Sequence, residues 1–239
     1  MATELNRSTG VFGATDRVVI DQALRAYMLQ VYNLMASGLL LSGIVAVLVA
    51  QSPAMMSAIF GSGLGIVAML APIGILLAMS FGVNRMSAGT LSMLYWVFVA
   101  TFGLSLAAIF QIYTATSIVR VFFITAATFG AMSLYGYTTQ RDLTGIGSFL
   151  FMGLIGIIIA SLVNMFIGST MLQFVVSVAS VLVFTGLTAY DTQRIKLDFY
   201  EGDAAEVQSK KAVFGAVSLY LNFLNLFMAL LHLIGTRRE

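Results

Sequence analysis

The residue of this chain best suited to chemistry is an acid at the end of a long apolar segment. Asp191 lies in the sequence Tyr190-Asp191-Thr192-Gln193-Arg194 and follows a stretch, Leu143 to Tyr190, without charged residues. An ionised carboxylate costs about 2.5–3.5 kcal/mol at the centre of a membrane-spanning helix and less toward the interface. One interpretation is that the chain uses this carboxylate. The other is that Asp191 merely begins a solvated loop, and position alone supports both.

Other polar residues lie within the last apolar segment. Asn222 and Asn225 occupy successive turns of the stretch Ser218–Phe227, and two amides near the middle of a helix indicate a helix shielded from lipid. His232, the only histidine, follows near the end of the segment. A lone histidine there is more often an interfacial hydrogen-bonding group than a proton relay.

A guanidinium accompanies the acid at the same end of the predicted bundle. Arg85 ends the second apolar segment on the side where Asp191 lies. The two could form a charge-assisted pair that joins two helices. From sequence alone, a positively charged anchor at the membrane surface is the favoured interpretation of Arg85.

These residues must be positioned by apolar segments of about 20 residues, the length that spans a bilayer as a helix. The sequence contains seven such segments, and it therefore predicts an all-α membrane protein with seven transmembrane helices in residues 27–236. Residues 1–26 form a polar tail, and the longest connection is expected from Asp191 to Lys211. The seven segments are Met28–Ala50, Leu64–Val83, Thr90–Ile112, Ser117–Tyr137, Ile146–Ile167, Met171–Tyr190 and Ala212–Ile234.

Composition excludes several classes of protein. Only 9% of the 239 residues are charged, against about 25% in a soluble domain, and 59% are hydrophobic. The net charge of +2, without a basic patch, argues against a nucleic-acid partner. Because the chain has no cysteine, disulfides, thiolate metal sites and cysteine nucleophiles are excluded. No cofactor is expected.

Positive charges predict the orientation in the lipid bilayer, because cytoplasmic loops are enriched in lysine and arginine. With a cytoplasmic N-terminus, nine basic residues lie inside and three outside, which favours this orientation. If the last segment re-enters instead of crossing, the C-terminus returns to the cytoplasm. The inside residues are Arg7, Arg17, Arg25, Arg85, Arg141, Arg194, Lys196, Lys210 and Lys211; the outside residues are Arg120, Arg237 and Arg238.

Three motifs resemble those of the Bax inhibitor-1 family, the transmembrane Bax-inhibitor-motif proteins. They are Phe184–Gln193, which ends in Tyr-Asp-Thr-Gln, Ser218–Phe227, and Phe129–Thr139, which is typical of the bacterial members. The resemblance extends from about Ala26 to Arg238. It implies a fold in which six helices surround the last one, a pH-sensitive calcium leak and, for a bacterial member, a location in the inner membrane.

The resemblance also implies roles for single residues. Family members that leak calcium have two acids that share a proton, and an arginine from the second span latches onto them. Asp191 matches the first acid, Asn222 occupies the position of the second, and Arg85 lies where the latch is expected. A family arginine near the end of the last helix is His232 here. Two carboxylates titrate as a coupled pair, whereas Asp191 and Asn222 cannot share a proton between two acids, so we expect weaker or shifted pH gating.

Two functions from different classes follow. The first is a leak pathway for calcium or other cations, gated by Asp191 with Asn222 and latched by Arg85, with Asn225 and His232 along the ion pathway. The alternative is a non-conducting interaction protein that modulates a membrane-bound AAA+ protease or a stress response, as some bacterial members of the family do, with the N-terminal tail as its contact.

Enzymatic activity is not expected. A zinc hydrolase of the ceramidase type needs several histidines, and a serine hydrolase needs a histidine partner at depth. A metal site is not predicted either. The acidic stretch from Asp198 to Glu206 lacks the spacing of a calcium-binding loop.

Overall fold

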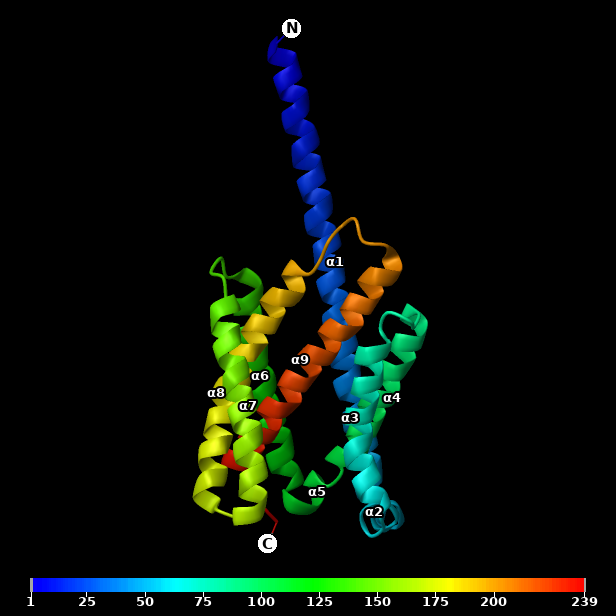
Figure 1. The fold of residues 1–239 in the computed structure, drawn as a ribbon, viewed down its shortest axis with the longest axis vertical. Helices are drawn as coiled ribbons and strands as arrows, with labels where there is room; N and C mark the ends of the chain where they lie inside the picture. The colour runs from blue at the N-terminus through cyan, green and yellow to red at the C-terminus, as the bar shows by residue number, and fades with distance from the viewer. Residues whose placement is uncertain (1, 239) are drawn as a thin grey trace.

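The computed structural model describes residues 2–238 and, within them, the side chains from Ile20 on. Seven helical stretches are long and apolar enough to cross a membrane, so the predicted seven-helix membrane fold is confirmed. They run alternately along one long axis between an N-side, where α1 enters, and a C-side, where the chain ends, at the top and bottom of Figure 1. The helices are α1 (Ala2–Gln51), α2 (Pro53–Phe60), α3 (Leu64–Gly82), α4 (Ala88–Leu106), α5 (Ile109–Ile112), α6 (Ala115–Thr138), α7 (Thr144–Ile167), α8 (Thr170–Leu197) and α9 (Ala205–Ile234).

The predicted loop from Asp191 to Lys211 is wrong in extent. Helix α8 continues to Leu197 and α9 begins at Ala205, so the connection consists only of residues 198–204. The helix does not end at Asp191 because Asp191, Thr192 and Gln193 are all buried against neighbouring helices, where their polar atoms find partners within the protein.

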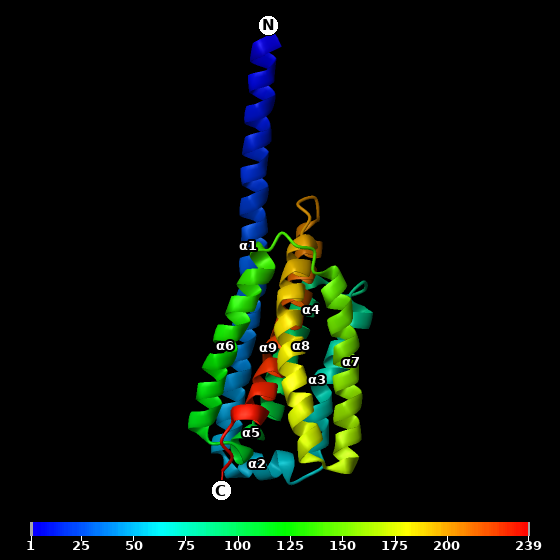
Figure 2. The ribbon, with the colours of Figure 1, turned by 90° about the vertical axis from the view of Figure 1, so that its left-hand side faces the viewer.

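Both ends of α1 differ from a simple span. Residues 2–26, expected as a tail, are continuous with α1, and their helix extends beyond the bundle on the N-side (Figure 1). At the other end Ser52 caps the short helix α2, because its Oγ accepts a hydrogen bond from the backbone N–H of Met55 at 3.3 Å and Pro53 occupies the first helical position. Helix α2 lies across the C-side of the bundle (Figure 2).

Helix α9 forms the core of the bundle. It is the most buried of the spans, with 56% of its apolar window inside the protein against 11% for α7. It packs against α1, α4, α6 and α8, whereas α3 and α7 are attached mainly through α4 and α8. Its oblique path through the bundle is visible in Figure 1. A helix so shielded from lipid can carry polar side chains at membrane depth.

The C-terminus establishes that α9 crosses the whole bundle. The backbone N–H of Thr114 donates to the carbonyl of Thr236 at 3.1 Å, and the N–H of Arg238 donates to the carbonyl of Ile112 at 2.9 Å. These bonds hold the chain end at the junction of α5 and α6, opposite the N-side. The re-entrant alternative for the last segment therefore does not apply.

Small residues bring the helices together within one chain. On α1, the Oγ of Ser42 donates to the carbonyl of Val99 in α4 at 2.6 Å and lies 2.7 Å from the hydroxyl of Tyr220 in α9. On α6, Gly136 lies directly against α8, and a Cβ at this position would overlap the carbonyl oxygen of Ala189. Close backbone approach of this kind supplies packing where lipid gives no hydrophobic drive.

We expect Gly136→Ala to destabilise the protein by about 1–3 kcal/mol, because the added methyl group must push α6 away from α8. The measurement is thermal unfolding in detergent. Gly130→Ala on the same helix is the matched control, since its Cβ meets nothing within 4 Å. Equal unfolding temperatures for the two variants would contradict the close approach of α6 and α8.

Candidate functional site

Four consecutive residues of α8 reach four different neighbours at the N-side. Successive residues of a helix are rotated by about 100°, so a run of four points in all directions. The ring of Tyr190 covers Gly147 of α7, and Asp191 points toward α9. The Oγ1 of Thr192 lies 3.0 Å from the Oγ of Ser133 in α6. Gln193 turns to the connection between α6 and α7. The motif therefore ties α8 to its surroundings on every side.

Gln193 fixes the start of α7 with two hydrogen bonds. Its Nε2 donates to the carbonyl of Arg141 at 2.7 Å, and its Oε1 accepts from the N–H of Leu143 at 2.8 Å. The Gln193 side chain and Leu143 are both buried, so the N–H of Leu143 depends on Gln193 for its hydrogen bond.

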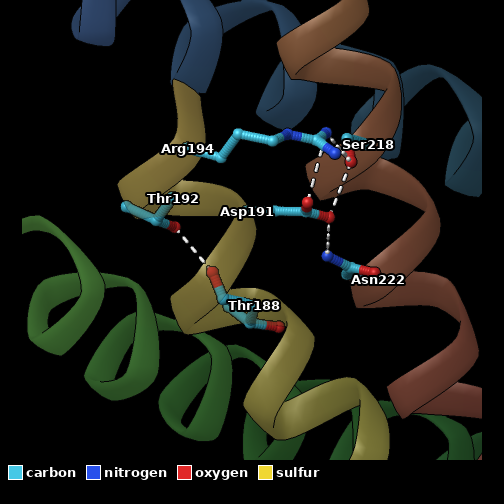
Figure 3. A network of polar contacts seen from close by, with 6 residues as sticks. All are labelled: Thr188, Asp191, Thr192, Arg194, Ser218 and Asn222. Carbon is cyan, nitrogen blue, oxygen red and sulfur yellow. Dashed lines mark hydrogen bonds and ion pairs between the residues drawn. The ribbon is translucent and has the colours of Figure 1, made fainter. Parts of the chain in front are cut away.

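The Asp191 carboxylate is the centre of a polar cluster between α8 and α9 (Figure 3). It is only 4% exposed. Its Oδ2 accepts from the Oγ of Ser218 at 2.7 Å and from the Nδ2 of Asn222 at 2.8 Å. Its Oδ1 lies 3.2 Å from a terminal guanidinium nitrogen of Arg194, one turn later on the same helix. We call Asp191, Arg194, Ser218 and Asn222 the Asp191 cluster.

All three partners of the carboxylate are donors. The carboxylate accepts hydrogen bonds from Ser218 and Asn222 through Oδ2, while Oδ1 has the ion pair with Arg194 and no hydrogen bond among the described residues. The same guanidinium lies 3.4 Å from the Oγ of Ser218, so it also reaches α9. Ionised Asp191 thereby connects the last two helices through two side chains of α9 and one arginine.

The structure brings Asp191 and Asn222 together but places a different arginine beside them. Arg194 contacts the carboxylate, whereas Arg85 lies exposed in the turn after α3, and no ion pair joins Arg85 to any side chain among those described. The latch role of Arg85 stays a prediction.

Sequence reasoning missed two members of the cluster. Arg194 could have been found from its spacing, since residues i and i+3 share a helix face. Ser218 could have been found one turn before Asn222, at i−4 on the same face of α9.

The other two predicted residues lie farther along α9. Asn225 is exposed, and its Nδ2 donates to the carbonyl of Leu221 at 2.8 Å. His232 lies at the C-side end of the helix with its ring 6.4 Å from that of Tyr113. Among the described residues, no hydrogen bond or ion pair joins Asn225 or His232 to the Asp191 cluster. They are part of the functional site only if that site extends along α9 toward the C-side.

The Asp191 cluster separates two cavities. On the N-side is a hollow of about 570 Å³, and toward the C-side is a groove of about 740 Å³ between α7, α8 and α9. Ser218 and Leu221 line both, Arg194 lines only the hollow, and Asp191 and Asn222 line only the groove. We call these cavities the N-side hollow and the α7–α9 groove. Side chains that line the hollow include Tyr27, Asn84, Arg194, Asp198, Lys210 and Lys211.

The two lysines of the N-side hollow each have an acidic partner. Lys210 lies 3.3 Å from the carboxylate of Glu206, and Lys211 lies 2.5 Å from that of Asp203. Within the described residues, no group of three or more acidic or histidine side chains is arranged to hold a metal ion.

Comparisons with known proteins cover nearly the whole chain. A family model described as "Inhibitor of apoptosis-promoting Bax1" matches residues 24–239. A protein of Rickettsia prowazekii (strain Madrid E) is 48% identical over 92% of this chain and 93% of its own length. The inner membrane protein YbhL of Escherichia coli (strain K12) is 44% identical over 95% of this chain and 99% of its own length. A membrane protein of Streptococcus pyogenes is 40% identical over 67% of this chain and 70% of its own length.

We expect Gln193→Leu to destabilise the protein by roughly 1–3 kcal/mol, because it leaves the buried N–H of Leu143 without a partner and removes the hydrogen bond to the carbonyl of Arg141. Thermal unfolding in detergent measures the effect. Gln173→Leu on the same helix is the control, because no hydrogen bond of its side chain is seen among the described residues. A loss of stability no larger than that of the control would show that Gln193 does not fix α7.

Proposed function

This chain belongs to the Bax inhibitor-1 family, and from that premise we propose that it forms a pH-sensitive leak pathway for calcium or other cations across a bacterial inner membrane. It is a multi-pass membrane protein with seven apolar helices. The observation that carries the proposal is the position of Asp191, a buried acid held at the boundary between the N-side hollow and the α7–α9 groove.

The closed state depends on the ionised carboxylate. Asp191 accepts hydrogen bonds from Ser218 and Asn222 and lies against Arg194, so α8 and α9 are held together where the two cavities meet. Protonation of Asp191 removes its charge and therefore its attraction to Arg194. It also adds a hydrogen-bond donor to a cluster in which Ser218, Asn222 and Arg194 are already donors. Acidification therefore weakens the connection and shifts the population toward an open state.

Several charged groups around the hollow set the electrostatic environment of Asp191. Arg194 is nearest, and Asp198, Lys210 and Lys211 line the hollow beyond it. Arg85 lies in the turn that follows α3, next to Asn84, which also lines the hollow. Because the lysines are paired with Glu206 and Asp203, the entrance carries no large unbalanced positive charge that would repel a cation.

The amide of Asn222 limits how the gate responds to pH. With one carboxylate in the cluster, one proton decides its charge, and there is no coupled second step. A single carboxylate also supplies few of the six to eight oxygens that calcium takes, so the cluster suits passage of a cation more than its storage.

A second candidate function uses the N-side extension of α1. The helix of residues 2–26 stands away from the bundle and is accessible to a partner such as a membrane-bound protease (Figures 1 and 2). Purified protein in liposomes contains no such partner. The absence of cation flux at every pH, from protein that is folded, would favour this candidate.

The choice between the two arginines is testable with matched variants. We expect Arg194→Gln to raise calcium flux into proteoliposomes at neutral pH by up to about fivefold, since a partly exposed ion pair is worth up to about 1 kcal/mol. Arg85→Gln should leave the flux unchanged in the geometry described. A rise in flux for Arg85→Gln alone would instead assign the latch to α3.

The pH dependence distinguishes the roles of Asp191 and Asn222. We expect wild-type flux, measured from about pH 5 to pH 8, to rise on acidification. Asp191→Asn should remove this response, and Asn222→Asp should steepen it by restoring two coupled acids. A steep response that survives in Asp191→Asn would contradict the role of this carboxylate.

A further inference from the structure

The polar side chains of α9 lie on one stripe. Ser218, Asn222, Asn225 and His232 occupy positions i, i+4, i+7 and i+14, which share a helix face. Between Ala212 and Ile234, Tyr220 is the only other residue with a polar side chain, and its hydroxyl already lies 2.7 Å from the Oγ of Ser42. The core helix thus presents its remaining polar groups in a single direction.

That direction is the α7–α9 groove. All four residues of the stripe line it. From α8 come Ser177, Ser180 and Asp191, and from α7 comes Ser161. Polar groups from three helices therefore line one cavity, from the Asp191 cluster to His232 at the C-side end of α9. Phe184 and Leu187 of α8 form an apolar wall between Ser180 and Asp191.

Asn225 shows what the groove must contain. It lies well inside α9, yet its side chain is exposed, and the described residues give it a single hydrogen bond, from Nδ2 to the carbonyl of Leu221. No hydrogen bond of its Oδ1 is seen among the described residues, and the residue lines the groove. Hydrocarbon cannot satisfy such a group, whereas water can, and polar side chains at membrane depth characteristically face water-filled cavities.

A second cavity is lined almost entirely by apolar side chains. It measures about 840 Å³ and lies between α1, α5, α6 and α9. Its one side chain with a hydroxyl, Ser42, uses that hydroxyl on Val99 and Tyr220. Its walls include Phe122, Phe123, Phe223 and Phe227. This cavity suits lipid chains and provides an internal comparison for the α7–α9 groove, whose walls are also mainly apolar but carry polar side chains from three helices.

We propose that the α7–α9 groove is filled with water and forms the C-side half of the cation route, closed toward the N-side by the Asp191 cluster. The role in cation passage rests on the function proposed above, but the hydration of the groove does not. Cations that pass the cluster meet the amide of Asn225 and then the hydroxyls of Ser177 and Ser180 before they reach His232.

The chain is suited to a direct test because it has no cysteine. Single variants Ser161→Cys and Asn225→Cys, reconstituted in liposomes, are treated with a cationic, membrane-impermeant methanethiosulfonate reagent. Thiols react as thiolates, which form in water and not in hydrocarbon. We expect both groove positions to react about tenfold faster or more than the controls. The controls are Ile159→Cys, an exposed position on α7 outside the groove, and Phe123→Cys in the apolar cavity.

Reaction of both groove cysteines at the slow rate of the two controls would overturn the proposal and indicate a groove filled by lipid. Formation of a disulfide-linked dimer by Asn225→Cys would also overturn it, because a second copy would then cover the groove. Ser161→Cys changes one oxygen to sulfur, so its result stands even if the Asn225 variant folds poorly.

The same samples separate this inference from the proposed function. Fast modification in protein that shows no calcium flux supports the hydrated groove and contradicts the leak pathway. Calcium flux in protein whose groove cysteines are unreactive supports the leak pathway and places the route elsewhere. Block of flux by modification of Ser161→Cys, but not of Ile159→Cys, supports both.

Discussion

The fold depends on one constraint: a carboxylate within a membrane-spanning bundle must be satisfied by the protein itself. Asp191 meets this requirement only where α8 and α9 cross, because two of its donors come from α9. The register between these helices is therefore set by the acid as well as by apolar packing. Because α9 also packs on α1, α4 and α6, the position of Asp191 influences the placement of most helices of the bundle.

The neighbours of Asp191 in the sequence connect α8 to further helices by hydrogen bonds. Thr192 meets Ser133 of α6, which in turn contacts the hydroxyl of Tyr32 in α1. Gln193 holds the start of α7. A single turn of α8 thus closes the N-side of the bundle by hydrogen bonds, while the C-side half of α7 remains largely exposed. Hydrogen bonds therefore join α8 to α6, α7 and α9 near the proposed gate, whereas α7 has few such connections toward the C-side.

The sequence predicted the seven spans because apolar length and charge are local properties, readable without knowledge of neighbours. It failed at the end of α8, where the continuation of the helix past Asp191 depends on burial by three other elements. The Asp191–Asn222 contact could be anticipated from the family motifs. The ion pair between Asp191 and Arg194 was missed although the two residues are three positions apart on one helix, and the latch role of Arg85 stays a prediction. The α7–α9 groove could not be predicted from the sequence either, because it depends on which faces of α7, α8 and α9 meet.

The central position of α9 has a consequence for biogenesis. It is the last span to leave the ribosome, yet it fills the space between α1, α4, α6 and α8. The six other spans must enter the bilayer before the helix that packs between them is in place, with lipid occupying its position. Completion of the protein then requires that a helix bearing Ser218, Asn222 and Asn225 displace that lipid, and Ser218 and Asn222 find their partner Asp191 only after the helix docks.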